Sequence, residues 1–223
     1  MNNKVILLIM DGWGIGDNTS VSAVHNASTP FYDKIIREYP KSMLHASGEN
    51  VGLPRGQMGN SEVGHMNIGA GRIVDQDLIR LNKNLSNKGV QNNVHFTNSV
   101  KEAISNNKNF HIIGLLSDGG VHSHSNHLYF ILDFLKEQKL KNIFIHVFTD
   151  GRDAQSNKGI NEIKKLKEYI EGTNIQIATV SGRYYSMDRD SRWERIKLAY
   201  DAMVNGIGKL SSNLIASIQT SYD

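Results

Sequence analysis

The chain has 223 residues, of which 39% are hydrophobic and 21% are charged, and it contains no cysteine. A chain of this kind can bury the core of one or two domains, which excludes a disordered protein, and the lack of cysteine excludes a disulfide scaffold. The formal net charge of +3 is too small to indicate a nucleic-acid partner.

The first predicted element is a continuous apolar run at residues 5–10, which is typical of a strand buried on both faces of a parallel sheet. This run is shorter than the apolar stretch of a signal peptide and far below the ~20 residues that span a membrane. We therefore expect a cytoplasmic protein without a membrane partner. Farther along, Thr29 and Pro30 predict the start of a short helix that ends before Pro40.

Residues 47–72 are rich in glycine and show almost no periodicity, which is typical of a functional or disordered segment. Within this segment Ser61 follows Asn60 and precedes a predicted short helix, whose N-terminus would favour an anion. A serine needs a base or a metal to become a good nucleophile, and Asp11 is predicted to be a hard oxygen ligand for such a metal. The alternative is that Ser61 merely caps the helix.

From about residue 110 the sequence alternates between two apolar patterns. Runs at residues 110–116, 143–148 and 175–180 predict three strands. Each run is followed by apolar residues at helical spacing, namely Leu128, Ile131, Leu132 and Leu135, then Ile163, Leu166 and Ile170, then Trp193, Ile196, Tyr200 and Met203. The alternation predicts an α/β fold with a parallel sheet and right-handed crossovers. Gly206 and Gly208 should end the last helix, and residues 209–223 predict no strong element.

Polar clusters follow each of these three predicted strands, at residues 117–124, 149–153 and 181–190. Ligands of open parallel sheets bind at the carboxyl ends of the strands, so the clusters predict a binding cleft there. Arginines suit carboxylate and phosphate oxygens, and the acids offer proton transfer or hydroxyl recognition. Together these side chains suit a ligand that is a small, phosphorylated and hydroxylated acid. The alternative is that they bind no ligand and form ion pairs on the surface. The residues in question are Arg152, Arg183, Arg189 and Arg192, with Asp118, Asp150 and Asp153.

A histidine cluster, His122, His124 and His127, lies in the first of these polar segments. Such clustering can bind Zn²⁺, but His124 and His127 fall near a predicted helix start, where histidine is also an ordinary cap or surface residue. The chain has neither the dinucleotide-binding glycine pattern nor a P-loop, so nucleotide cofactors are not indicated.

Five motifs in order, at residues 10–14, 56–67, 116–124, 149–153 and 182–195, closely resemble those of the 2,3-bisphosphoglycerate-independent phosphoglycerate mutases. This family belongs to the alkaline-phosphatase-like superfamily. The resemblance implies a glycolytic isomerase that interconverts 3-phosphoglycerate and 2-phosphoglycerate through a phosphoserine intermediate, with two Mn²⁺ ions.

The resemblance also implies residue roles. Ser61 would be the nucleophile that carries the phosphoryl group, and Asp11 and Ser61 would be ligands of one metal ion. The substrate-binding residues would be His122, Arg152, Asp153, Arg183 and Arg189.

The resemblance implies two domains as well. Residues 1–74 would be the first piece of a discontinuous, metal-binding phosphatase-like domain, and residues 75–223 would be part of an inserted α/β phosphotransferase domain. Chains of the family are more than twice as long and carry further metal ligands, so we expect a fragment with little activity by itself, and a monomer when complete. Two alternatives stay open, namely a non-catalytic phosphoglycerate-binding fragment and another phosphatase or phosphomutase of the superfamily.

Overall fold

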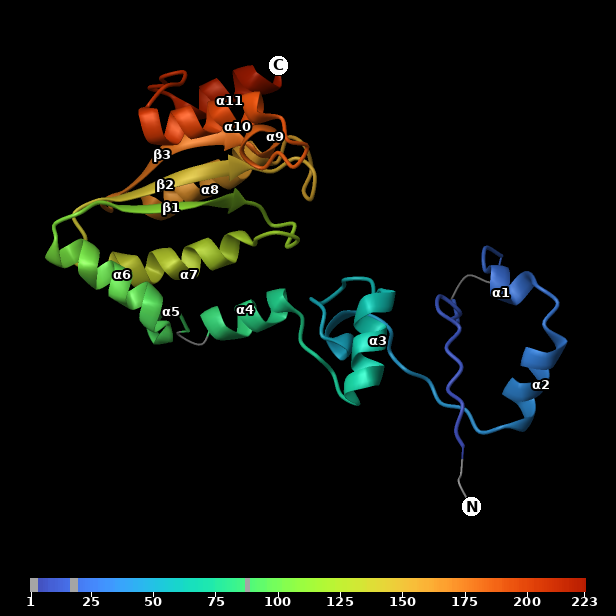
Figure 1. Ribbon diagram of the computed structural model, residues 1–223. Coiled ribbons are helices and arrows are strands. Elements are labelled where there is room, and N and C mark those ends of the chain that lie inside the picture. Colours follow the sequence, from blue (N-terminus) through green and yellow to red (C-terminus); the bar gives the residue numbers. More distant parts are fainter. Residues whose placement is uncertain (1–3, 17–19, 87–88) are drawn as a thin grey trace. The chain divides into compact units, whose positions relative to one another are not determined.

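The computed structural model describes residues 4–16, 20–86 and 89–223 of the chain. It divides into two compact units, Met1–Ile79 and Arg80–Asp223, which we call the N-terminal and the C-terminal unit (Figure 1). Among the described residues, no helix combines the length and the apolar composition that crossing a membrane requires.

The N-terminal unit contains short helices joined by irregular chain. Its elements are α1 (Ala23–Asn26), α2 (Pro30–Glu38), the 3₁₀ turn η1 (Gly48–Val51) and α3 (Ser61–Ala70). Helix α2 confirms the prediction made from Thr29 and Pro30, and it ends before Pro40 as expected. The Thr29 hydroxyl donates to Asp33 Oδ1 at 2.9 Å, so it does not bond to the helix backbone.

Residues 5–10 do not form the predicted strand and belong to no helix or strand. Val5 and Ile6 are 90% and 92% exposed, where the prediction had them buried. A strand needs a neighbouring strand to satisfy its N–H and C=O groups, and the described part of the N-terminal unit provides none. The prediction therefore identified a β-prone segment but was wrong about the element.

The packed part of the N-terminal unit surrounds helix α3. Val51, Leu53 and Val63 form its buried apolar cluster. Asn67 ties the helix to the chain on both sides, since its side-chain amide donates to the Val51 carbonyl at 3.0 Å and accepts from the Val74 N–H at 2.8 Å. Helix α3 is thereby fixed relative to the glycine-rich segment that precedes it.

The C-terminal unit alternates helices and strands. Its helices and strands, with α4 beginning just before it, are α4 (Asp77–Ser86), α5 (Gly89–Asn92), α6 (Val94–Ser105), β1 (Phe110–Leu116), α7 (Ser125–Lys136), β2 (Ile143–Thr149), α8 (Gly159–Ile170), β3 (Ile175–Gly182), α9 (Arg183–Ser186), α10 (Trp193–Tyr200), the π-helical turn η2 (Asp201–Asn205) and α11 (Leu214–Tyr222).

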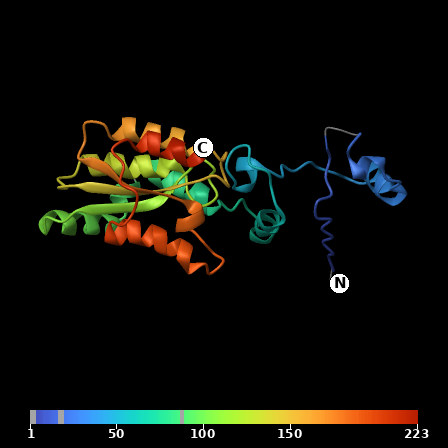
Figure 2. The same cartoon turned by 90° about the horizontal axis from the view of Figure 1, so that it is seen from above.

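Strands β1, β2 and β3 form one parallel sheet in that order, with Phe110 opposite Ile143 and Ile143 opposite Ile175. Helices α7 and α8 connect the strands and pack on one face of the sheet together with α11, whereas α10 lies on the other face (Figure 2). The predicted α/β fold with strand–helix alternation is confirmed. Because the strands are parallel, the segments that follow β1, β2 and β3 all leave the same edge of the sheet.

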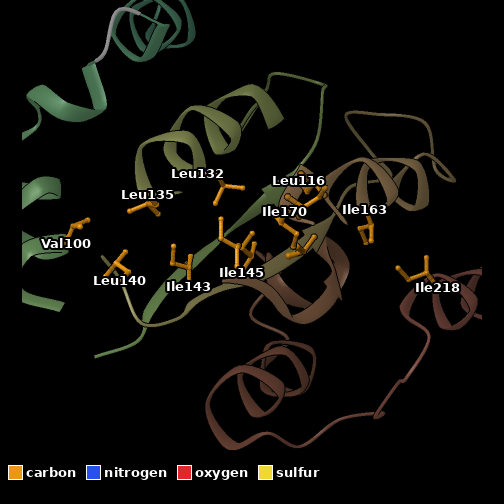
Figure 3. Packing of buried hydrophobic residues seen from close by; sticks show 13 residues of the cluster. Val100, Leu116, Leu132, Leu135, Leu140, Ile143, Ile145, Ile163, Ile170 and Ile218 are labelled. Atoms are coloured by element: carbon orange, nitrogen blue, oxygen red, sulfur yellow. The ribbon is translucent and has the colours of Figure 1, made fainter. Parts of the chain in front are cut away.

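The core of the C-terminal unit lies between the sheet and the helices on this first face (Figure 3). Leu132 and Leu135 of α7, and Ile163 of α8, are fully buried against Ile143 and its neighbours in β2. The helical spacings that predicted α7 and α8 therefore correspond to faces that are buried in the structure.

Two predictions about the C-terminal residues are wrong. On α10 the residues at helical spacing do not form a buried face: Trp193 is 74% exposed, Tyr200 is also exposed, and Ala199 is the buried residue. Residues 209–223, for which the sequence predicts no strong element, contain α11. Its N-cap Asn213 accepts the Ala216 N–H, and its Ile218 joins the core.

Candidate functional site

Ser61 and Asp11 meet in the N-terminal unit, although they lie 50 positions apart in the sequence. The Ser61 hydroxyl donates a hydrogen bond to Asp11 Oδ2, and both side chains are exposed. Asp11 lies in a turn that is closed by a 3.1 Å hydrogen bond from the Trp13 N–H to the Met10 carbonyl. The two residues that the resemblance assigns to one metal ion are thus in direct contact, and their roles stay predictions.

Asn60 caps helix α3, because its side-chain oxygen accepts the Val63 N–H at 3.0 Å. Ser61 is the first residue of the helix, so the alternative that it merely caps the helix is wrong. Gly59 allows the chain to pass close to Ala46, since a Cβ at position 59 would lie 1.8 Å from the Ala46 carbonyl oxygen. These local features place the Ser61 hydroxyl at the positive end of the helix dipole, where an anion is favoured.

An open pocket of 1080 Å³ surrounds Ser61, and we call it the serine pocket. Its lining comes from within residues 9–13, 43–51 and 58–73, all in the N-terminal unit. Asp11, His65 and Arg72 lie on its wall beside the serine. His65 Nδ1 lies 2.8 Å from the Ser61 carbonyl oxygen, which holds the imidazole against the first turn of α3.

The donors in the serine pocket suit a hard divalent cation, because the Asp11 carboxylate and the Ser61 hydroxyl both offer oxygen. A cation of this kind normally takes about six ligands. Across residues 4–16, 20–86 and 89–223, no group of three or more His, Asp or Glu side chains is placed to hold an ion. The two donors therefore match Mn²⁺ in chemical kind, but they do not complete a site by themselves.

The histidine cluster has separate partners in the structure. His124 caps helix α7 through its Nδ1, His127 Nε2 lies 2.6 Å from Asn82 Oδ1, and His122 Nε2 lies 3.7 Å from Asp153 Oδ2. Burial lowers the pKa of His127, and the neighbouring His124 lowers it further. The described part of the chain therefore supports the capping interpretation over the zinc interpretation.

A second pocket, of 600 Å³, lies at the carboxyl ends of β2 and β3 in the C-terminal unit, and we call it the arginine cleft. Three of the five predicted substrate-binding residues, Arg152, Arg183 and Arg189, line it. Its full lining is Thr149, Asp150, Gly151, Arg152, Gly182, Arg183, Tyr184, Met187, Asp188, Arg189, Asp190 and Arg195. A cleft is thus present at the ends of β2 and β3, and four arginines line it, but none of residues 117–124, which the prediction also placed there, is part of its lining.

The other two predicted residues, Asp153 and His122, are not among the residues that line this cleft, but Asp153 bonds to Arg183, which is. Arg183 Nη1 donates to Asp153 Oδ2 at 2.5 Å and to Asp150 Oδ1 at 2.9 Å. Burial lowers the pKa of Arg183, but the hydrogen bonds to Asp153 and Asp150 outweigh it and raise the pKa. His122 lies beside Asp153, and Gly119 allows the two loops to approach, since a Cβ there would lie 2.6 Å from the Asp153 carbonyl oxygen.

The segment that carries Arg189 is organised by Asp188, whose role the sequence did not reveal. Asp188 accepts the Arg192 N–H at 2.9 Å and the Arg195 guanidinium at 3.0 Å, and Arg195 also lies over the Tyr184 ring at 3.9 Å. The bond from the Arg192 N–H is the main cause that lowers the pKa of Asp188. Arg195 lines the cleft, whereas Arg192, which the sequence suggested, is absent from its lining.

Two of the acids that were candidates for proton transfer have structural partners. Asp118 pairs with Lys158, and the hydrogen bond from Lys158 is the largest cause that lowers the pKa of Asp118. Asp150 is buried, and it accepts hydrogen bonds from Ser117 and Arg183. Asp153 is therefore the acid of the three whose carboxylate lies beside both a guanidinium and an imidazole.

Comparisons with known proteins agree on one family. A family model described as the BPG-independent PGAM N-terminus matches residues 81–223. The 2,3-bisphosphoglycerate-independent phosphoglycerate mutases of Flavobacterium psychrophilum, Flavobacterium johnsoniae and Bacteroides fragilis are 53%, 50% and 48% identical to the chain over its whole length. The chain spans 44% of the length of each of these curated relatives.

A solved structure supports the same fold. The phosphoglycerate mutase of Leishmania mexicana, crystallised at low cobalt concentration, matches with a TM-score of 0.69 and 33% sequence identity. The match covers 95% of this chain and 40% of that chain. The α/β architecture described above is therefore that of a known phosphoglycerate mutase.

Proposed function

Because the chain belongs to the BPG-independent phosphoglycerate mutase family, whose N-terminal part it represents, we propose that it serves the interconversion of 3-phosphoglycerate and 2-phosphoglycerate. In this proposal the arginine cleft binds the glycerate substrate, and Ser61 accepts its phosphoryl group. The observation that carries the proposal is the arginine cleft itself, where three arginines of the family motifs line one pocket at the strand ends.

The arginine cleft suits a small anion with several oxygens. Arg152, Arg183 and Arg189 can hold carboxylate or phosphate oxygens in paired hydrogen bonds. Asp153 bonds to Arg183, and we assign to it the exchange of protons with the hydroxyls of the bound glycerate. His122, beside Asp153, completes the substrate-binding set.

Ser61 is proposed as the group that carries the phosphoryl group between the two hydroxyls. Its Oγ forms a bond to phosphorus while the bond from phosphorus to the glycerate oxygen breaks and that oxygen takes up a proton. The reverse step returns the phosphoryl group to the other hydroxyl. Asp11 accepts a hydrogen bond from Ser61, so it can receive the serine proton or hold the oxygen in position.

A divalent cation, for which we propose Mn²⁺, would be held by Asp11 and Ser61 together with further ligands. When bound, such an ion neutralises phosphate charge and lowers the pKa of a coordinated hydroxyl. We also propose that residues 1–74 are the first piece of a phosphatase-like domain and residues 75–223 part of a phosphotransferase domain. The complete protein is proposed to be a cytoplasmic, glycolytic monomer, and the 223-residue chain is proposed to have little activity alone.

Complementation with a relative tests this function. The chain is co-expressed with the C-terminal remainder of the Flavobacterium psychrophilum enzyme, and conversion of 3-phosphoglycerate is measured with Mn²⁺. We expect turnover in the combined sample, little in either part alone, and none with Ser61→Ala, because the phosphoryl acceptor is removed. Ser99→Ala, at an exposed serine of α6, is the matched control. Undiminished turnover with Ser61→Ala would refute the assigned role.

A second candidate function is binding without turnover, and one observation favours it. The arginine cleft lies wholly within the C-terminal unit and requires no residue of the serine pocket. The chain by itself should then bind 3-phosphoglycerate in calorimetry. Arg152→Ala should weaken binding about tenfold or more, because a charge-assisted contact is worth roughly 1.5–3 kcal/mol. Arg37→Ala, at an exposed arginine of α2, should have no effect.

A further inference from the structure

Asp150 fixes the loop that follows strand β2. Its Oδ1 accepts three successive backbone N–H groups, from Gly151 at 2.7 Å, Arg152 at 2.9 Å and Asp153 at 3.1 Å. One carboxylate oxygen thereby sets the backbone of both Arg152 and Asp153, two of the residues proposed to bind the substrate. Bonds from N–H groups to an ionised carboxylate are among the stronger hydrogen bonds in proteins.

The same carboxylate also reaches the segments after the other two strands. Ser117, which follows β1, donates its hydroxyl to Asp150 Oδ2 at 2.6 Å. Arg183, which follows β3, donates Nη1 to Asp150 Oδ1 at 2.9 Å. Asp150 therefore links the carboxyl ends of all three strands, and it does so at the edge of the sheet where the arginine cleft lies.

Asp150 is among the residues that line the arginine cleft, but almost none of its side chain is accessible to a ligand. Its side chain is 3% exposed, and both oxygens already accept hydrogen bonds. Burial alone would raise the pKa of Asp150, but the hydrogen bonds from Ser117, the Arg152 N–H, Arg183 and the Gly151 N–H outweigh burial and hold the pKa well below its ordinary value. The carboxylate is therefore ionised at neutral pH and cannot exchange a proton with a ligand there.

We propose that Asp150 is the positioning residue of the arginine cleft, which holds Arg152, Asp153 and Arg183 in one arrangement before the substrate arrives. The substrate part of this inference rests on the proposed function. A cleft whose groups are already fixed does not spend binding energy on ordering them, so the loss of Asp150 weakens ligand binding without removing any group that touches the ligand.

Asparagine is the sharpest substitution, because Asp150→Asn keeps the shape of the side chain but removes its charge. The matched control is Asp133→Asn on helix α7, where the carboxylate is 60% exposed and bonds to Tyr169 away from the cleft. Ser117→Ala is a milder variant that removes a single bond to Asp150, and it keeps the test valid if Asp150→Asn fails to fold.

The first measurement needs no ligand and follows proton exchange by NMR in the 223-residue chain. In Asp150→Asn, the Arg152 and Asp153 amides and the Arg183 guanidinium should exchange at least about tenfold faster, because each loses a charge-assisted bond. Ser117→Ala should show the same pattern at about two- to fivefold, and Asp133→Asn should show none. Unchanged exchange at these three residues, in whichever of the first two variants folds, would overturn the positioning role.

The second measurement is the affinity for 3-phosphoglycerate by calorimetry. Asp150→Asn should lower it at least about tenfold, and Asp150→Glu should not restore it, because the longer side chain cannot meet three successive amides. Equal affinity of Asp150→Asn and the unsubstituted chain would overturn the inference. If the unsubstituted chain binds no phosphoglycerate, the proposed binding function fails, while the exchange rates still decide whether Asp150 orders the cleft.

Discussion

At the scale of single residues, burial decides which task a carboxylate can perform. Asp11 is exposed beside Ser61 and keeps accessible oxygens, so it can take part in chemistry. Asp150 is buried with both oxygens engaged, so it can only position other groups. Asp153 lies between these limits, because Arg183 holds it while its side chain stays 14% exposed. Three residues of one type thus lie in three different environments, which their sequence neighbours alone do not distinguish.

His146 is expected to make the stability of the C-terminal unit depend on pH. It lies on β2, 3.0 Å from His111 Nδ1 and 2.9 Å from Thr179 Oγ1. Burial lowers the pKa of His146, and the neighbouring His111 lowers it further. The unfolded chain, with an ordinary histidine pKa of about 6.5, therefore binds this proton more readily than the folded chain. The stability from a neutral His146 is full above about pH 6.5 and is lost as pH falls toward the lowered pKa.

The expected result is a smaller acid sensitivity in His146→Gln. Urea unfolding at pH 7.5 and 5.5 should show a smaller loss of the free energy of unfolding than in the unsubstituted chain. Part of the acid-induced loss of stability should remain in His146→Gln, because the pKa of His127 is also lowered. His95→Gln, at an exposed histidine of α6, is the control and should keep the full loss. An equal loss in His146→Gln would show that His146 does not cause the effect.

At the scale of elements, a helix cap determines at which residue the helix begins, and therefore which side chain lies at its N-terminus. Asn60 caps α3 and thereby makes Ser61 the first residue of the helix, next to Asp11. Asn93 caps α6 in the same way, with its side chain accepting the Phe96 N–H at 3.0 Å. The two caps are chemically matched, but only the first lies beside a candidate catalytic residue.

This pair allows a controlled test of helix α3. Asn60→Ala should destabilise the first turn of α3 by about 1 kcal/mol, because the Val63 N–H loses its partner. Hydrogen exchange should then become faster in the amides of α3 and stay unchanged in α6. Asn93→Ala should give the reverse pattern. Protection of α3 that survives Asn60→Ala would contradict the importance of this cap.

At the scale of the whole molecule, the buried apolar residues are distributed unequally between the two units. The cluster of the C-terminal unit draws on α6, α7, α8, α11 and all three strands, whereas the cluster in the described N-terminal unit consists of Val51, Leu53 and Val63. Hydrophobic burial is the main favourable term in folding. The C-terminal unit is therefore expected to carry most of the measurable stability of this chain.

Leu132 tests this expectation because it is fully buried in the larger cluster. Leu132→Ala should lower the free energy of unfolding by roughly 2–5 kcal/mol, through lost burial and the cavity left behind. Leu210→Ala is the control, since Leu210 is 92% exposed and its truncation should change stability by less than about 0.5 kcal/mol. Equal effects of the two substitutions, measured by urea unfolding, would contradict the assigned core.

Much of the C-terminal fold could be predicted because its signals are local. Strands β1, β2 and β3 and helices α7 and α8 follow from apolar periodicity, which reflects the geometry of a single element. The cleft at the strand ends could also be predicted, because parallel strands bring the segments after them to one edge. The same reasoning predicts Arg152, Arg183, Arg189 and Arg192 at this edge. The first three line one pocket and Arg192 does not, and the part of these arginines in catalysis stays a prediction.

Residue type and short-range spacing are enough to predict the family, the strand–helix alternation and the residues that carry the candidate chemistry. The folded chain adds that no strand of the described residues pairs with residues 5–10, that Trp193 is exposed, that α11 joins the core, and that Asp150 bonds to the segments after all three strands. These outcomes depend on partners far away in the chain. A contact or hydrogen bond between distant segments involves two groups, so the sequence around one of them does not identify the other.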